Sequence, residues 1–134
     1  MAKLPRAGDV ARRDAPTCGL DERLGDVKRR VRESGWDVCV VVNDERVVLG
    51  LLRAQQLDEP DDRRAEEVMR PGPSTFRPHV PIHEIAETME EHGLANVPIT
   101  TSDGRLVGVL KLEDAQRALH EMHEAHEHHH HEDE

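Results

Sequence analysis

Residues 104–114, Gly-Arg-Leu-Val-Gly-Val-Leu-Lys-Leu-Glu-Asp, place a turn, an apolar run and the start of a helical pattern in direct succession. A shift of 58 positions lays residues 46–56, Arg-Val-Val-Leu-Gly-Leu-Leu-Arg-Ala-Gln-Gln, on this segment without a gap. The same register continues toward the N-terminus and gives further identical pairs: Arg6/Arg64, Ala7/Ala65, Val10/Val68, Arg12/Arg70, Thr17/Thr75, Glu33/Glu91 and Gly35/Gly93. A fixed offset of this kind indicates that one supersecondary unit is present twice.

The composition, with 36% hydrophobic and 34% charged residues among 134, fits a soluble globular protein. A unit of about 55 residues buries little apolar surface by itself, so the two copies are expected to share a core. No apolar run approaches the ~18 residues of a membrane span, and the N-terminus lacks the apolar segment of a signal peptide. We therefore expect a cytoplasmic protein with no membrane partner.

The net charge of −10 is concentrated in the C-terminal tail, which from His120 onward holds six acidic residues and no Lys or Arg. Only Trp36 and Phe76 are aromatic. A nucleic-acid-binding surface combines positive charge with stacking aromatic side chains. The composition therefore argues against a nucleic-acid partner.

Each copy is predicted to run strand, helix, strand, strand, helix after a short helical turn. Apolar residues at helical spacing predict an amphipathic helix that ends at Gly35 in one copy and at Gly93 in the other. The apolar run 38–42 predicts a buried strand that continues into a hairpin, and Pro60 cuts short the last helix of the first copy. The predicted boundaries are 5–59 for the first unit, 60–119 for the second, 58–65 for the linker and 120–134 for a His/Glu-rich tail that is expected to be disordered.

This order of elements, the doubling, the segment Glu67-Val68-Met69-Arg70-Pro71 and the two hairpins together resemble the CBS domain family over roughly residues 6–119. The resemblance implies an α+β fold, a tandem pair of βαββα units related by a pseudo-two-fold axis and called a Bateman module. It also implies clefts between the units that hold adenine nucleotides, and face-to-face homodimers formed through the helices.

The resemblance supplies candidate ligand residues. In the family the hairpin ends in Gly-h-x-[Ser/Thr]-x-x-Asp, where the hydroxyl meets phosphate and the Asp grips the ribose diol. In the second copy Lys111 stands in the hydroxyl's place and Asp114 is retained. An ammonium attracts phosphate, and a carboxylate accepts two hydrogen bonds from a diol. The alternative is a solvated Lys111 and an Asp114 that only favours the helix dipole.

In the first copy the corresponding residues are Arg53 and Gln56, so the diol-binding carboxylate is missing. We expect this site to be empty, or Arg53 to reach across to the phosphates of the other site. A surface arginine is the alternative. By resemblance, Thr75, Ala95, Asn96 and Pro98 line the adenine pocket, with Thr17, Asp37, Val38 and Val40 as their first-copy counterparts. Trp36 is interpreted as a core residue.

No Ser, His and acid stand at a catalytic spacing, so the chain is predicted not to be an enzyme. Imidazoles at the density of the tail bind nickel, copper or zinc. The possible ligands there are His126, His128, His129, His130 and His131. Cys18 and Cys39 are expected to be reduced and partly buried, with a reactive Cys18 as the alternative.

The leading hypothesis is a regulatory CBS pair that binds ATP, ADP, AMP or S-adenosylmethionine and signals to an unknown regulated protein by a conformational change. A homodimer is expected from the family and from apolar helix faces at Val27/Val31 and Ile85/Met89, which half-size repeats are not expected to cover alone. The alternatives are a ligand-free scaffold module and a metal-binding protein that acts through its tail.

Overall fold

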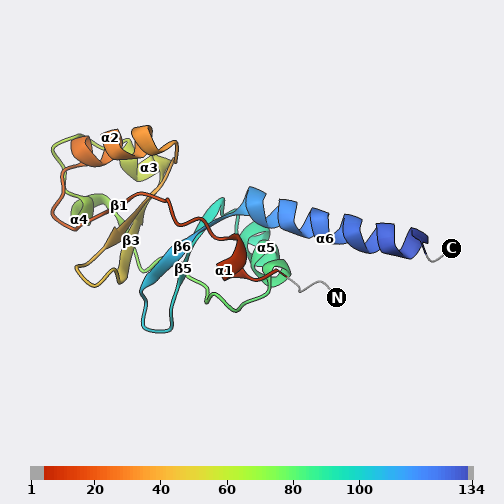
Figure 1. Ribbon diagram of the computed structural model, residues 1–134. Helices are drawn as coiled ribbons and strands as arrows, with labels where there is room; N and C mark the ends of the chain where they lie inside the picture. The colour runs from red at the N-terminus through yellow and green to blue at the C-terminus, as the bar shows by residue number, and fades with distance from the viewer. Residues whose placement is uncertain (1–4, 133–134) are drawn as a thin grey trace.

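The computed structural model describes residues 5–132, with side chains described for residues 5–122. The first repeat contains β1 (Thr17–Cys18), α2 (Leu24–Ser34), β2 (Cys39–Val42), β3 (Val48–Leu52) and α3 (Ala54–Leu57). The second contains α5 (Ile82–Glu91), β5 (Asn96–Thr100), β6 (Leu106–Lys111) and α6 (Leu112–Glu132). Each repeat is preceded by an arm, α1 (Ala7–Val10) in one case and α4 (Ala65–Val68) with β4 (Arg70–Pro71) in the other. Figure 1 shows the two halves side by side, with α6 projecting from the second.

The helices follow from the predicted patterns. Helix α2 buries Leu24, Val27 and Val31 on one face and stops at Gly35, whose φ of 79° is left-handed. Left-handed backbone costs a glycine little, since glycine has no Cβ. Helix α5 ends at Glu91 with His92 as its cap, and Gly93, with φ 65°, makes the left-handed turn directly after the cap. The prediction that glycine ends both helices is confirmed.

The two sheets repeat the same pairings. In the first half β1 runs parallel to β2, β2 antiparallel to β3, and β3 antiparallel to β4. In the second half Phe76 forms a parallel bridge with Ile99, β5 pairs with β6, and Arg12 forms an antiparallel bridge with Val109. The predicted tandem α+β architecture is confirmed.

The arms are exchanged between the repeats. Although α1 precedes the first repeat, its Ala7 is fully buried in the core of the second half. Ala65 of α4 is fully buried in the core of the first half, beside Leu24 and Val27. Backbone hydrogen bonds fix both arms, because Ala7 N donates to Val80 O and Ala65 N donates to Glu22 O, each at 2.9 Å. Each half therefore depends on a segment that belongs to the other copy in sequence.

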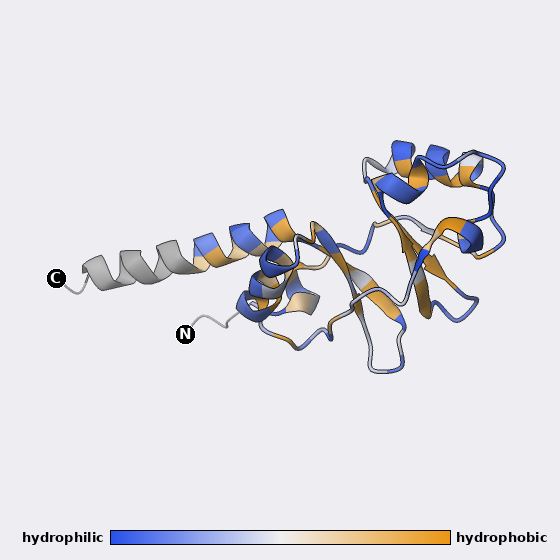
Figure 2. Ribbon diagram, turned by 180° about the vertical axis from the view of Figure 1, so that it is seen from behind, coloured by the Kyte–Doolittle hydropathy of each residue, from blue (hydrophilic) through white to orange (hydrophobic). Residues whose placement is uncertain are grey.

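A third cluster joins the halves. The alternation of β2 sends Cys39 and Val41 toward α2 and sends Val40 to the opposite face. There Val40 and Leu51 of the first repeat pack with Val109 of the second. The full cluster is Trp36, Val38, Val40, Leu51, Leu106 and Val109. In Figure 2 the strands are largely hydrophobic and the outer faces of α2 and α6 are hydrophilic, which matches a core shared by the two sheets.

The hairpin glycines lie where the arms cross. A Cβ on Gly108 would lie 2.6 Å from the Arg12 carbonyl oxygen of the exchanged arm. A Cβ on Gly50 would meet the side chain of Met69 instead. The glycine that both repeats carry at this position is therefore explained by the close approach of an arm in each half.

Two expectations from sequence need correction or restriction. The apolar faces at Val27/Val31 and Ile85/Met89 are buried within the chain, with at most 6% exposure, so they leave nothing uncovered for a dimer to bury. The prediction of a disordered tail falls mainly on residues 123–134. Their side chains at 123–132, and all of 133–134, lie outside the described residues.

Candidate ligand clefts between the repeats

A cleft of about 470 Å³ opens where the end of α2 meets the start of α6. Its walls come from both repeats: Gly35, Trp36 and Asp37 from the first, and Ala95, Asn96, Lys111, Leu112, Glu113 and Gln116 from the second. We call this the Trp36 cleft. Its volume lies in the usual range for small-molecule sites. Of the residues predicted to bind ligand, Ala95, Asn96 and Lys111 line this cleft.

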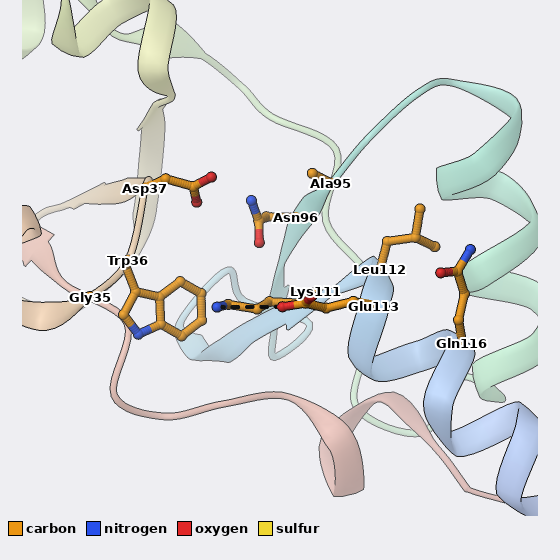
Figure 3. Close-up of a pocket in the computed structure, with 9 residues that line it drawn as sticks. All are labelled: Gly35, Trp36, Asp37, Ala95, Asn96, Lys111, Leu112, Glu113 and Gln116. Carbon is orange, nitrogen blue, oxygen red and sulfur yellow. Dashed lines mark ion pairs between the residues drawn. The ribbon is translucent and has the colours of Figure 1, made fainter.

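Lys111 is the cation of the Trp36 cleft. Its Nζ lies 4.4 Å from the centre of the Trp36 ring, which is a cation–π contact, and 3.9 Å from a Glu113 carboxylate oxygen. Figure 3 shows the lysine reaching from β6 across to the indole. Trp36 is 6% exposed, so the prediction of a core residue is correct, yet the same side chain also forms a wall of the cleft.

Two polar side chains of the cleft are free to meet a ligand. Within the described part of the chain, neither the Asp37 carboxylate nor the Asn96 amide makes a hydrogen bond or ion pair. Asn96 is only 7% exposed, and its amide lies on the cleft wall in Figure 3. A nearly buried amide without a protein partner gains from a ligand group that completes its hydrogen bonds.

Asp114, the predicted diol ligand, is held by the protein itself. Its two carboxylate oxygens accept hydrogen bonds from Arg12 Nε at 2.6 Å and from Arg12 Nη2 at 2.9 Å. Arg117 Nη1 donates to the same carboxylate at 3.1 Å. The bidentate pair with Arg12 holds the pKa of Asp114 below its ordinary value, with smaller contributions from Arg117 and Lys111.

Asp114 and Arg12 line a separate hollow beside α1 and α6. Sequence reasoning missed Arg12 because its partner is 102 positions away. A usable signal was its identity with Arg70 across the repeat. Sequence reasoning also gave Asp37 only as a counterpart of Ala95, although both residues line the Trp36 cleft.

A second cleft, of about 400 Å³, lies at the equivalent place in the other half. It is lined by Leu51, Arg53, Arg70, Pro71, Gly72, Pro73, Ser74, His92 and Leu94, and we call it the Arg53 cleft. Arg53, predicted as a ligand residue, therefore lies apart from Lys111. Gln56 turns back onto the chain, where its Oε1 accepts a hydrogen bond from Arg53 N at 2.9 Å.

Two predicted residues line none of these hollows. The Thr75 hydroxyl accepts a hydrogen bond from Arg77 Nη2. Pro98 is buried in β5, opposite Val109. The seven predicted ligand residues are therefore divided among the Trp36 cleft, the Arg53 cleft, the Arg12–Asp114 hollow, the interior for Pro98 and a half-buried position outside these hollows for Thr75.

Metal ligation is not seen in the part of the chain whose side chains are described, since no group of three or more His, Cys, Asp or Glu side chains converges there. The tail candidates His126 and His128–His131 lie outside that part. Cys18 and Cys39 are free and buried, as expected. None of the described helices is long and apolar enough to cross a membrane.

Comparison with known proteins adds a family and a fold. The family model of the CBS domain matches residues 7–57 and again residues 65–121. An uncharacterised protein of Methanopyrus kandleri, MK0525, is 26% identical over 115 residues, which is 80% of this chain and 59% of that protein. The chain thus spans less than two thirds of that relative.

Solved structures agree with the chain in fold. The cytosolic domain of the Mg²⁺ channel MgtE in complex with ATP has a TM-score of 0.78 and 21% identity, over 84% of this chain and 48% of that one. The CBS domain pair of protein MJ0100 in complex with 5′-methylthioadenosine and S-adenosyl-L-methionine has a TM-score of 0.79 and 15% identity, over 90% and 99%. At these identities the likeness concerns the fold.

Proposed function

The chain belongs to the CBS domain family, and on that premise we propose that it is a regulatory module that binds an adenosyl ligand in the Trp36 cleft. The observation that carries the proposal is the pairing, in one inter-repeat cleft, of the Lys111 ammonium with an unpaired carboxylate and an unpaired amide. The structures of similar fold hold ATP in one case and S-adenosylmethionine in another, and both ligands contain an adenosyl group. ATP, ADP, AMP and S-adenosylmethionine are therefore the ligands to test.

We assign roles by chemistry. Lys111 attracts the phosphates or carboxylate of the ligand tail. Asp37 offers two acceptor oxygens for the ribose diol, a role that the sequence gave to Asp114. Asn96 pairs with the edge of the base, while Ala95 and Leu112 supply apolar contact. Asp114 is engaged by Arg12 in the separate hollow and has no direct role in this cleft in the proposal.

Signalling follows from the position of the cleft between the repeats. A ligand that contacts both repeats binds one arrangement of the halves better than another and shifts the population toward it. The module is then a sensor for an unknown regulated partner rather than an enzyme, in the cytoplasmic setting expected from the sequence. The homodimer expected from the family remains a prediction.

Trp36, the only tryptophan, gives a direct test. Because Lys111 lies over its ring, a ligand that moves the ammonium should change the indole fluorescence. We expect at least one of the four ligands to change the emission saturably and to raise the melting temperature, since a ligand that binds only the folded state stabilises it.

Substitutions in the cleft assign the roles. Lys111→Gln should weaken ATP roughly tenfold and adenosine little, because only ATP presents phosphates to the ammonium. Asp37→Asn should weaken adenosine and ATP alike. Charge-matched controls are Arg29→Gln on α2 and Asp44→Asn in the first hairpin, both exposed.

Two results would replace this proposal. If Asp114→Asn abolishes binding while Asp37→Asn does not, the diol ligand is Asp114 and Arg12 must turn away from it. If none of the four ligands changes the fluorescence or the melting temperature, the ligand-free scaffold module takes the place of the sensor.

A further inference from the structure

The Arg53 cleft holds two guanidinium groups that no described acidic side chain neutralises. Within the residues whose side chains are described, neither Arg53 nor Arg70 donates a side-chain hydrogen bond or forms an ion pair. The lining residues, all from the described part of the chain, include no Asp or Glu. Two like charges placed together without an acid repel each other, and an anion between them would remove that cost.

The equivalent arginine of the other arm shows why Arg70 is unpaired. Arg12 has Asp114 as its partner, held through two hydrogen bonds. The repeat places Gln56 where that carboxylate stands, and the Gln56 side chain caps the backbone at Arg53 instead. The charge of Arg70 is therefore available to a ligand in the cleft that Arg70 lines.

The walls of the cleft select against a nucleoside. A ribose diol is held well by a carboxylate, which accepts a hydrogen bond from each hydroxyl. Among the described residues that line the cleft there is no carboxylate and no Phe, Tyr or Trp, and the apolar side chains are Leu51, Leu94, Pro71 and Pro73. The remaining polar side chains, the Ser74 hydroxyl and the His92 imidazole, are both able to donate hydrogen bonds.

We propose that the Arg53 cleft is a separate binding site for a small phosphorylated anion, recognised through the Arg53 and Arg70 guanidinium groups and not through a nucleoside. Guanidinium groups bind phosphate oxygens in bidentate geometry. A volume of about 400 Å³ exceeds the needs of a single phosphate, so a diphosphate or a phosphate on a small organic group fits the class. The site is independent of the adenosyl ligand proposed for the Trp36 cleft.

Inorganic pyrophosphate is the probe, measured by titration calorimetry on the full chain at low ionic strength. We expect saturable one-to-one binding that weakens with added salt, because Arg70 is exposed and Arg53 is partly exposed. Arg53→Gln and Arg70→Gln should each weaken binding about tenfold or more. Neither side chain has a partner among the described residues, so both variants should melt near the wild-type temperature.

Matched variants make the test specific. Arg29→Gln removes the same charge from α2 and should leave the affinity within about twofold. Gln56→Asp restores the acid that Arg12 has in the other half and should weaken pyrophosphate binding by competing for Arg70. Adenosine should not compete with pyrophosphate, and pyrophosphate bound here should leave Trp36 fluorescence unchanged.

Three outcomes would overturn the proposal. The first is no binding of pyrophosphate at low ionic strength. The second is an equal loss in Arg29→Gln, which would mean unspecific charge attraction. The third is binding that changes Trp36 fluorescence and is lost in Lys111→Gln but kept in Arg53→Gln, which would place the anion in the Trp36 cleft. The third outcome does not contradict the proposed adenosyl site. If no adenosyl ligand changes the Trp36 fluorescence or the melting temperature, the adenosyl site is contradicted and the anion site in the Arg53 cleft is not.

Discussion

The two halves of the molecule share the same backbone fold and differ in the partners of their basic side chains. In the second half Arg12 is bound by Asp114, and Lys111 lies between Trp36 and Glu113. In the first half the corresponding acids are replaced by glutamines, and Arg53 and Arg70 have no carboxylate partner among the residues whose side chains are described. Equivalent basic residues of the two repeats therefore need not have the same role. Whether such a residue forms a structural ion pair or is available to a ligand depends on the acidic residue beside it.

The difference extends to the walls of the two clefts. Trp36 of the Trp36 cleft corresponds across the repeat to Leu94, which lines the Arg53 cleft. One cleft thus combines an aromatic surface with charges of both signs, while the other has cations and small polar groups. Two sites made from one unit are expected to recognise different chemistry.

The hairpin glycines give the largest expected effect. Gly108→Ala places a Cβ against the Arg12 backbone carbonyl, which cannot move unless the arm shifts. We expect a loss of about 3 kcal/mol in the free energy of unfolding, and roughly 10 °C in melting temperature. Gly50→Ala meets the flexible Met69 side chain and should cost about 1 kcal/mol. Urea unfolding of both variants measures the difference, and equal losses would show that the two arms are held equally tightly.

The next effect concerns the Arg12–Asp114 pair. Asp114→Asn keeps the shape and removes the charge, leaving Arg12 without its strong acceptor. Because the Arg12 side chain is 42% exposed, water replaces part of the interaction, and we expect a loss of about 1–2 kcal/mol. Gln56→Ala, at the equivalent position, removes one neutral capping bond and should cost about 0.5–1 kcal/mol. A larger cost for Gln56→Ala would contradict the contrast between the halves.

The same pair predicts a pH dependence. The pKa of Asp114 is lowered in the folded state, so its stabilising effect is present above its unfolded pKa, about 3.9, and is lost as pH falls through the lower folded pKa. The stability difference between wild type and Asp114→Asn should be constant above about pH 5 and should shrink below about pH 4. The difference for Gln56→Ala should not change with pH. Melting temperatures between pH 3 and pH 7 test both statements.

The smallest effect concerns the thiols of the first half. Cys18 and Cys39 correspond to Phe76 and Val97 in the second half and are 3% and 0% exposed. A hydrogen bond with Cys18 and burial raise the pKa of the Cys39 thiol, which opposes formation of the reactive thiolate. Alkylation by iodoacetamide at pH 8 should be slow for both thiols and should proceed at the rate at which this half opens. Rapid alkylation of Cys18 alone would restore the alternative of a reactive cysteine.

Local features of this fold were predictable from sequence. The glycine stops of α2 and α5, the hairpins and the offset of 58 positions rest on short-range patterns that a reader of the chain can see. The exchange of the arms was not predictable in this way, because Ala7 and Ala65 show the same apolar pattern whichever half they pack against. The Arg53 cleft contains Arg70 and Pro71 of an exchanged arm, and the prediction grouped Arg53, Thr75 and Asp114 in one site although the structure separates them.

Ion pairs between residues far apart in sequence were the second feature that could not be predicted. Nothing near Asp114 in sequence indicates that Arg12 binds it, since the ion pair joins residues 102 positions apart. The offset of the repeat aligns Arg12 with Arg70, but it does not indicate that the two arginines have different surroundings. Which arginine has an acidic partner could be determined only from the three-dimensional positions of Arg12, Arg70 and the acidic side chains.

The exchanged arms also determine the order in which the chain can fold. The first half cannot complete its core until Ala65 has been synthesised, and the second half already needs Ala7 from the far N-terminus. A protein divided at Pro60 would separate both arms from the halves that they complete. Long-range closure of this kind raises contact order and slows folding, yet it joins the two halves into a single cooperative transition. The sequence repeat and the structural half therefore contain different residues, because each half includes the arm that precedes the other repeat.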